Sequence, residues 1–130
     1  MRRLFLALAL TTLVACGGST AKYTWPAVEA PSGGTVVEGM ASWYGPGFHG
    51  KQTASGEIYD MDDLTAAHLY WAFGTRVKVT LLDTGQSVVV RVNDRFPGHK
   101  GRVIDVSRGA ARAIGLIGPG VAKVRLEIVS

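Results

Sequence analysis

The side chains best suited to acid–base chemistry lie in the second half of the chain. Asp94 and Arg95 stand near the start of a polar segment, residues 93–101, that follows a strand-like run of alternating residues. A carboxyl group in a loop after a strand is a candidate general acid or base, because such loops form exposed sites. The alternative is an aspartate that caps a turn or pairs with Arg95.

Other common chemistries lack their residue patterns. His49, His68 and His99 are 19 and 31 residues apart and form no helical i, i+4 pair, so we expect no metal site. Gly45-Pro46-Gly47 is not followed by Lys-Ser/Thr, and no serine has the context of a nucleophile elbow. Cys16 is the only cysteine, which excludes a disulfide framework. We expect neither a metal nor another cofactor.

The composition is that of one folded domain. The chain has 130 residues, of which 47% are hydrophobic and 18% are charged, a balance that argues against disorder. The formal net charge is +4, but no basic run occurs, so nucleic acid is a poor candidate partner.

The N-terminal segment, residues 1–15, has the features of a secretory signal. Arg2 and Arg3 precede an apolar stretch, residues 4–14, that is too short to span a membrane. Residues 13–16, Leu-Val-Ala-Cys, span the end of this segment, resemble a bacterial lipobox and imply lipidation of Cys16. The alternative is a plain signal peptide with an incidental cysteine. Gly17 in place of Asp suggests, by analogy, a lipid anchor on the periplasmic face of the outer membrane.

Residues 16–34 are rich in Gly, Ser, Thr, Ala and Pro and predict a lipidated flexible linker. Residues 35–130 predict a mainly β domain. Alternation and turn residues favour strands at 36–44, 57–59, 76–82, 86–92, 102–106 and 121–129. We expect short helices at 62–68 and from Ser107 to Ile114, with Gly115 as the stop. Closing these strands into a small barrel removes the sheet edges.

Seven segments, taken together, match one family. They are 39–45 (GMASWYG), 48–50 (FHG), 53–57 (TASGE), 64–68 (LTAAH), 73–75 (FGT), 90–95 (VRVNDR) and 104–107 (IDVS). In this order, behind a lipobox, they resemble the rare lipoprotein A family, septal-ring lytic transglycosylases with a double-psi β-barrel domain. The resemblance implies a six-stranded double-psi β-barrel.

The same resemblance implies peptidoglycan glycan strands as the ligand. Active family members cleave the MurNAc–GlcNAc bond without water and leave a 1,6-anhydro end, whereas other members have little activity. Three departures stand out: Phe96 replaces the usual Gly before Pro97, Trp71-Ala72 replaces a frequent Leu-Pro, and we expect no SPOR domain after the barrel. Without that domain we expect no septal targeting by that route.

The resemblance also assigns catalytic candidates. Asp94 is the favoured acid and base in turn, and it would have to hold a proton beside Arg95, which favours the charged form. Glu57 matches the family's Thr-Ala-x-Gly-Glu segment as a neighbouring carboxylate, or is a surface residue that holds a loop. His68 would orient Asp94 or contact sugar, or is a packing residue. Asp105 matches the acid of related barrels, although with its neighbour Ser107 it is also typical of a helix start.

Trp43, Tyr44 and Arg95 are the candidate substrate-binding residues. The two aromatic rings offer flat faces to sugar, and they are equally typical of core and rim positions. Two other functions stay open. One is a non-catalytic wall-binding or expansin-like lipoprotein, suggested by Phe96 and the missing SPOR domain. The other is a small envelope or division protein that acts through a protein partner.

Overall fold

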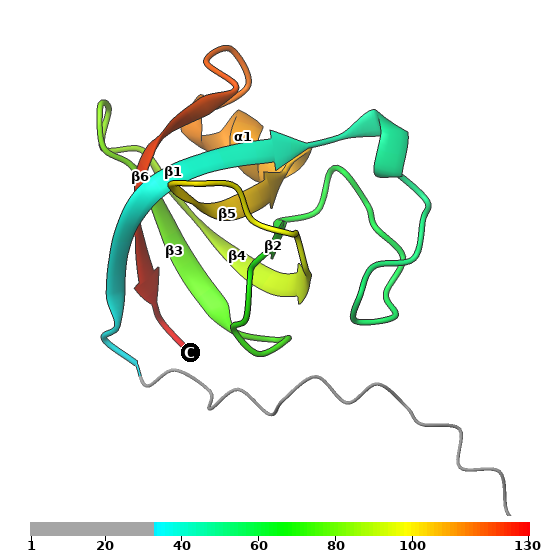
Figure 1. Cartoon of the computed structure of the whole chain (residues 1–130). Helices are drawn as coiled ribbons and strands as arrows, with labels where there is room; N and C mark the ends of the chain where they lie inside the picture. The colour runs from blue at the N-terminus through cyan, green and yellow to red at the C-terminus, as the bar shows by residue number, and fades with distance from the viewer. Residues whose placement is uncertain (1–32) are drawn as a thin grey trace, which may run out of the picture.

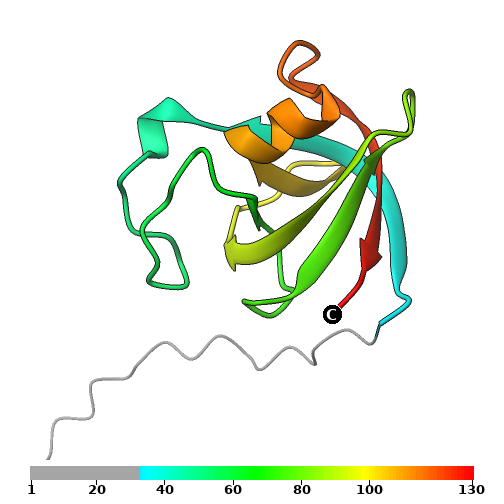
Figure 2. The same ribbon diagram turned by 180° about the vertical axis from the view of Figure 1, so that it is seen from behind.

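The computed structural model describes residues 33–130, which form a closed barrel with one short α-helix. The predicted signal segment, Cys16 and almost all of the predicted linker lie outside the described residues. The elements are β1 (Val36–Tyr44), the 3₁₀ helix η1 (Pro46–Phe48), β2 (Thr65–Ala67), β3 (Arg76–Leu81), β4 (Ser87–Asp94), β5 (Arg102–Ser107), α1 (Arg108–Ile114) and β6 (Val121–Ile128). Figures 1 and 2 show the barrel from opposite sides.

The six strands close in the order β1-β5-β2-β4-β3-β6. β1 runs parallel to β5 and β2 runs parallel to β4, whereas the other four neighbours are antiparallel. Each parallel pair needs a crossover, because only antiparallel strands can be joined by a tight turn. The crossovers bring distant parts of the chain together, and the long segment between η1 and β2 projects from one side of the barrel (Figure 1).

Alternating residues build the core. In β3, Val77, Val79 and Leu81 are buried while the residues between them are not, as a strand with one face toward the core requires. β6 repeats the pattern with Val124 and Leu126. The strands at 36–44, 76–82, 86–92, 102–106 and 121–129 are therefore confirmed, with small changes at their ends.

The helix α1 begins and ends where the sequence predicts. The Ser107 side chain accepts a hydrogen bond from the backbone N–H of Ala110, and Gly115 adopts a left-handed φ of 78° at the C-terminal end. Only glycine takes that conformation without steric cost. Ala111 and Ile114 are fully buried and anchor the helix on the barrel.

The predicted helix at 62–68 is wrong. Residues 65–67 form β2, which pairs with β4 on one side and β5 on the other and is buried throughout. Barrel closure requires this strand, and its pairing outweighs the weak local helix preference. The residues before β2 instead hydrogen-bond to the start of α1. The Met61 carbonyl accepts the backbone N–H of Gly109, and the Asp63 carbonyl accepts the Ser107 hydroxyl.

Two smaller predictions also change. The expected strand at 57–59 is reduced to an isolated bridge between Ile58 and Gln52. β4 extends through Asn93 to Asp94, so Asp94 is the last residue of a strand and not a loop residue.

Within residues 33–130, no helix is long and apolar enough to cross a membrane.

Candidate active site

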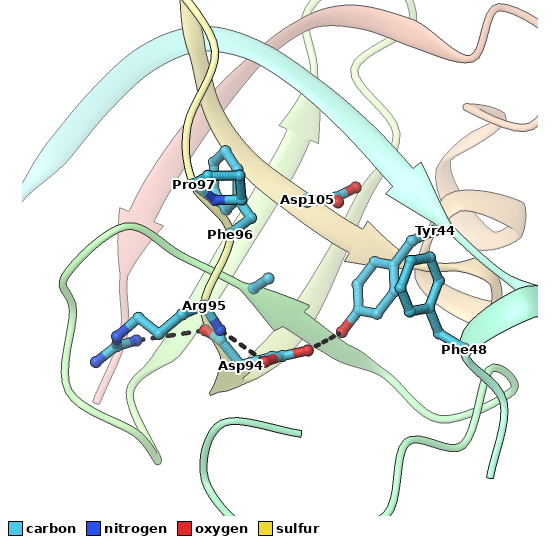
Figure 3. A pocket seen from close by; sticks show the side chains of 8 residues that line it. Tyr44, Phe48, Asp94, Arg95, Phe96, Pro97 and Asp105 are labelled. Carbon is cyan, nitrogen blue, oxygen red and sulfur yellow. Dashed lines mark hydrogen bonds between the residues drawn. The ribbon is translucent and has the colours of Figure 1, made fainter. Parts of the chain in front are cut away.

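A cavity of about 180 Å³ opens where the ends of β1, β2 and β4 meet β5. Its walls are Tyr44, Phe48, Ala67, Asp94, Arg95, Phe96, Pro97 and Asp105. The two aspartates lie between an aromatic side formed by Tyr44 and Phe48 and an apolar side formed by Phe96 and Pro97 (Figure 3). Two carboxyl groups therefore share a cavity with largely apolar walls.

Strand register brings the two aspartates together. Ala67, the last residue of β2, pairs with Asp94 of β4 and with Asp105 of β5. Because neighbouring strands are about 4.8 Å apart, the two aspartate backbones are held roughly 10 Å apart across Ala67. The small alanine side chain leaves the space between them open.

The Asp94 carboxylate is held by three donors. Its Oδ1 atom accepts the backbone N–H of Ala54 at 2.9 Å and that of Arg95 at 2.8 Å. Its Oδ2 atom accepts the Tyr44 hydroxyl at 3.5 Å. Donors that converge on both oxygens fix the orientation of this side chain toward the cavity.

Asp105 has a different environment. Burial raises the pKa of the Asp105 carboxyl, and the hydrogen bond from Ser42 Oγ to its Oδ1 at 3.1 Å opposes that shift. The nearby Arg102 also lowers this pKa, whereas the charge of Asp94 raises it. Arg102 reaches the same serine, since its Nη1 atom donates to Ser42 Oγ at 3.3 Å. Asp105 is therefore the carboxyl group better prepared to hold a proton.

Tyr44 links the aromatic wall to Asp94. Its ring stacks on Tyr59 with centroids 4.4 Å apart and meets Phe48 edge-on at 5.7 Å. Burial and the charge of Asp94 raise the pKa of the Tyr44 phenol, so the group stays protonated and donates to the carboxylate. Strand alternation puts Ser42 and Tyr44 on one face of β1, a signal by which Ser42 could have been found.

His68 is buried beside the site and does not line the cavity. Its Nδ1 atom accepts the backbone N–H groups of Tyr70 and Trp71 at 3.2 and 3.0 Å, and its ring stacks on Trp71 at 3.9 Å. Burial and the neighbouring Arg95 lower the pKa of His68 to about 4. The imidazole is therefore neutral at neutral pH. The backbone N–H of His68 donates to the backbone carbonyl of Asp94 at 3.1 Å.

Glu57 also lies outside the cavity walls. It forms an ion pair with Arg91, with Oε2 and Nη1 2.6 Å apart, and both side chains are about two-fifths exposed. This hydrogen bond to Arg91 lowers the pKa of Glu57. Glu57 therefore carries no proton at neutral pH that it could donate.

Of the two other predicted substrate-binding residues, Arg95 lines the cavity and Trp43 does not. Arg95 lines the cavity, but its guanidinium turns aside, donates to the carbonyls of Asp94 and His68, and lies 4.1 Å from the ring centre of Phe73. Trp43 packs against the buried core and is not part of the cavity wall. Phe48 is a wall residue that reasoning from the sequence did not name as a site residue, although it begins segment 48–50 of the family resemblance.

A family model described as "Lytic transglycolase" matches residues 36–126. The chain belongs to this family. The match runs from the start of β1 into β6, so it contains every wall residue of the cavity. The lytic transglycolase domain of this chain is a six-stranded double-psi β-barrel, which confirms the predicted fold and family.

Similar proteins carry a related name. The chain is 65% identical over 94 residues to the "Probable endolytic peptidoglycan transglycosylase RlpA" of Synechocystis sp., covering 72% of this chain and 29% of the relative. It is 50% identical over 108 residues to the "Endolytic peptidoglycan transglycosylase RlpA" of Campylobacter jejuni, covering 83% of this chain and 38% of the relative. The chain thus spans about a third of the length of these relatives.

Two solved structures share the fold. The Streptomyces papain inhibitor superposes with a TM-score of 0.64 at 21% identity, covering 78% of this chain and all of the inhibitor. An expansin of Clavibacter michiganensis gives a TM-score of 0.60 at 26% identity, covering 74% of this chain and 51% of the expansin. One barrel architecture therefore accompanies proteins of quite different names, and function has to be argued from the cavity.

Proposed function

We propose that this chain is a lytic transglycosylase that cleaves the MurNAc–GlcNAc bond of peptidoglycan glycan strands without water. The observation that carries the proposal is the pair of carboxyl groups, Asp94 and Asp105, with unlike surroundings on one cavity. Glycoside cleavage requires one group that donates a proton and one that stabilises positive charge or accepts a proton. The relatives that match this domain are named endolytic peptidoglycan transglycosylases, which supports peptidoglycan as the substrate class.

In this mechanism Asp105 is the proton donor. Its proton passes to the glycosidic oxygen, the bond from that oxygen to C1 of MurNAc breaks, and the GlcNAc side leaves as a free hydroxyl. The Asp94 carboxylate faces the positive charge that develops at C1. It then accepts the proton of the C6 hydroxyl as O6 bonds to C1, which closes a 1,6-anhydro ring. Exchange with bulk water resets both carboxyl groups, and no water is consumed.

The cavity walls supply the rest of the site. Phe48 and Phe96 face the aspartates from opposite sides (Figure 3) and offer apolar surfaces to the C–H faces of a sugar ring. Tyr44 holds Asp94, and His68 holds the Asp94 backbone from behind. In this account Glu57 and His68 are positioning residues.

We further propose that Cys16 carries the lipid anchor and that residues 17–34 tether the barrel to the periplasmic face of the outer membrane. The lipobox-like Leu-Val-Ala-Cys supports this location, and two or more acyl chains give stable anchoring. Replacing Cys16 by Ala should release the protein from the membrane fraction of a bacterial host. A variant that stays in that fraction would contradict the anchor.

The function is tested with residues 17–130 on isolated sacculi. We expect released glycan from the unaltered chain. Removing a general acid or base typically costs about 10² to 10⁴ in rate, so Asp94→Asn and Asp105→Asn should each lose cleavage by such a factor and still bind sacculi. Full activity of both variants would overturn the assignment.

A wall-binding protein without catalysis is the second candidate, because the fold resembles an expansin and Phe96, in place of the family's usual Gly, lines the cavity. It predicts binding to sacculi with no released product from the unaltered chain. Sacculi stripped of stem peptides should be included, so that a need for bare glycan is not mistaken for inactivity.

A further inference from the structure

Residues 53–57, which we call the clamp loop, form a tight turn beside β4. The backbone N–H and the hydroxyl of Thr53 both donate to the carbonyl of Glu57, at 2.7 and 2.9 Å. Gly56 N–H donates back to the Thr53 carbonyl at 3.0 Å, and its φ of 92° is the left-handed conformation that glycine allows. The turn is thus closed by its own hydrogen bonds.

The clamp loop meets β4 at both of its ends. At one end the Ala54 N–H donates to Asp94 Oδ1 at 2.9 Å. At the other end Arg91 Nη1 lies 2.6 Å from Glu57 Oε2. One loop therefore joins a solvent-facing ion pair to the carboxylate at the cavity.

A few further polar contacts also hold the loop: Gln52 Nε2 donates to the Gly56 carbonyl at 3.3 Å, and the Asn93 side chain hydrogen-bonds Glu57. The Ser55 N–H donates to the Asn93 carbonyl at 3.2 Å, and the Ser55 hydroxyl lies 3.3 Å from Glu57 Oε2. The side chains of the loop are largely exposed, apart from Thr53. With so little apolar burial, the few polar contacts set the loop's position on the strand.

We infer that Arg91 is a positioning residue, which acts through Glu57 to hold the clamp loop on β4 and so keep the Ala54 amide on the Asp94 carboxylate. This inference rests on the proposed role of Asp94. It gives Glu57 a function that does not require proton transfer, and it assigns a role to Arg91, which the sequence did not single out.

The chain offers a matched control for this ion pair. Arg125 and Glu38 form a second exposed pair, with Nη2 and Oε1 3.2 Å apart and side chains 46% and 44% exposed, against 42% and 43% for Arg91 and Glu57. It joins β6 to β1, and neither residue lines the cavity. Exposed pairs of this kind contribute little to stability, so breaking either pair should change Tm little.

The first test observes the loop directly and needs no activity. In the unaltered protein the amide proton resonances of Ala54 and Arg95 should both shift as Asp94 is protonated, because both amides bond to its Oδ1 atom. In Arg91→Ala the Arg95 response should persist while the Ala54 response is lost. In Glu38→Ala both should persist. An Ala54 response that survives in Arg91→Ala would overturn the inference.

The second test follows cleavage of glycan. A misplaced reacting group costs up to roughly 100-fold in rate, so we expect Arg91→Ala and Glu57→Ala each to lower kcat about tenfold, with KM and Tm close to those of Glu38→Ala. The double variant should be no worse than either single variant, because both break the same link. Arg91→Lys should recover most of kcat.

The two tests separate the inference from the proposed function. If the unaltered chain cleaves no glycan, the proposed function fails, and the amide resonances still decide whether Arg91 holds the loop. If glycan is cleaved and Arg91→Ala retains full kcat, the positioning role is refuted while the proposed function stands.

Discussion

Asp94 and Asp105 are both register partners of Ala67, one from each neighbouring strand. The strand between them sets their spacing, and their surroundings differ. Asp94 is bonded by the Ala54 and Arg95 amides, whereas Asp105 is buried beside Ser42. The closed barrel thus places two carboxyl groups with different surroundings on one cavity.

The raised pKa of Asp105 makes a prediction about stability. A carboxyl group whose pKa is higher in the folded state binds more protons in the folded state than in the unfolded state. The free energy of unfolding therefore falls as pH rises from the unfolded pKa, near 4, through the higher folded pKa. Asp105→Asn removes the buried charge and keeps an acceptor for Ser42. The variant should therefore have a higher Tm than the unaltered protein at pH 7, and the difference should vanish near pH 3. Thermal unfolding at several pH values measures this, and a variant with lower Tm at pH 7 would contradict it.

Ser42 should tune the acid. Its hydroxyl donates to Asp105 and opposes the effect of burial, so Ser42→Ala should raise the pKa of Asp105 further. The alkaline limb of the pH–rate profile, where Asp105 loses its proton, should move to higher pH. Ser87→Ala, an exposed change at the start of β4, should leave the limb in place. An unmoved limb in Ser42→Ala would argue that another group is the acid.

The buried His68 should make the protein less stable as pH falls, whereas Asp105 should make it less stable as pH rises. Its folded pKa of about 4 lies below the ordinary 6.5, so its contribution is complete above pH 6.5 and is lost as pH falls toward 4, by about 3 kcal/mol. His68→Asn keeps an acceptor for the two amides and should abolish this pH dependence. His68→Leu should cost about 1–3 kcal/mol for each of the two amides it leaves without a partner. Denaturant unfolding between pH 4 and 8 tests both variants.

The apolar walls should contribute to binding more than to the chemical step. Phe48→Ala and Phe96→Ala each remove aromatic surface that faces the cavity, and a loss of about 1 kcal/mol corresponds to roughly fivefold weaker glycan binding. Val36→Ala, an exposed apolar change outside the cavity, is the control. Co-sedimentation with sacculi measures the affinities. Tighter binding by Phe96→Ala would mean that this ring obstructs the glycan.

Local sequence patterns predicted much of the barrel. Alternating apolar residues marked β3 and β6, and Ser107 and Gly115 marked both ends of α1, because these signals depend on a few neighbouring residues. β2 was missed because Thr65–Ala67 is a strand only through its pairing with β4 and β5. The local sequence of these three small residues does not predict that they close the barrel.

The site was predictable only in part for the same reason. Asp94, Asp105, Tyr44 and Arg95 were named as candidates from the sequence, and all four line the cavity. The proximity of Asp94 to Asp105 depends on the register of their strands with β2. The ion pair between Arg91 and Glu57 joins residues that are 34 positions apart in the sequence. Pairings of that kind follow from the closed fold and cannot be deduced from spacing along the chain.

The most direct test of the account is cleavage of sacculi by residues 17–130 in water enriched in ¹⁸O, with released glycans analysed by mass. The account predicts new reducing-side ends that are 1,6-anhydro, one water lighter than hydrolysed ends, and free of ¹⁸O. Uptake of one ¹⁸O atom at each new end would contradict it and establish hydrolysis. Binding without any released product, from both intact and stem-peptide-free sacculi, would contradict catalysis itself.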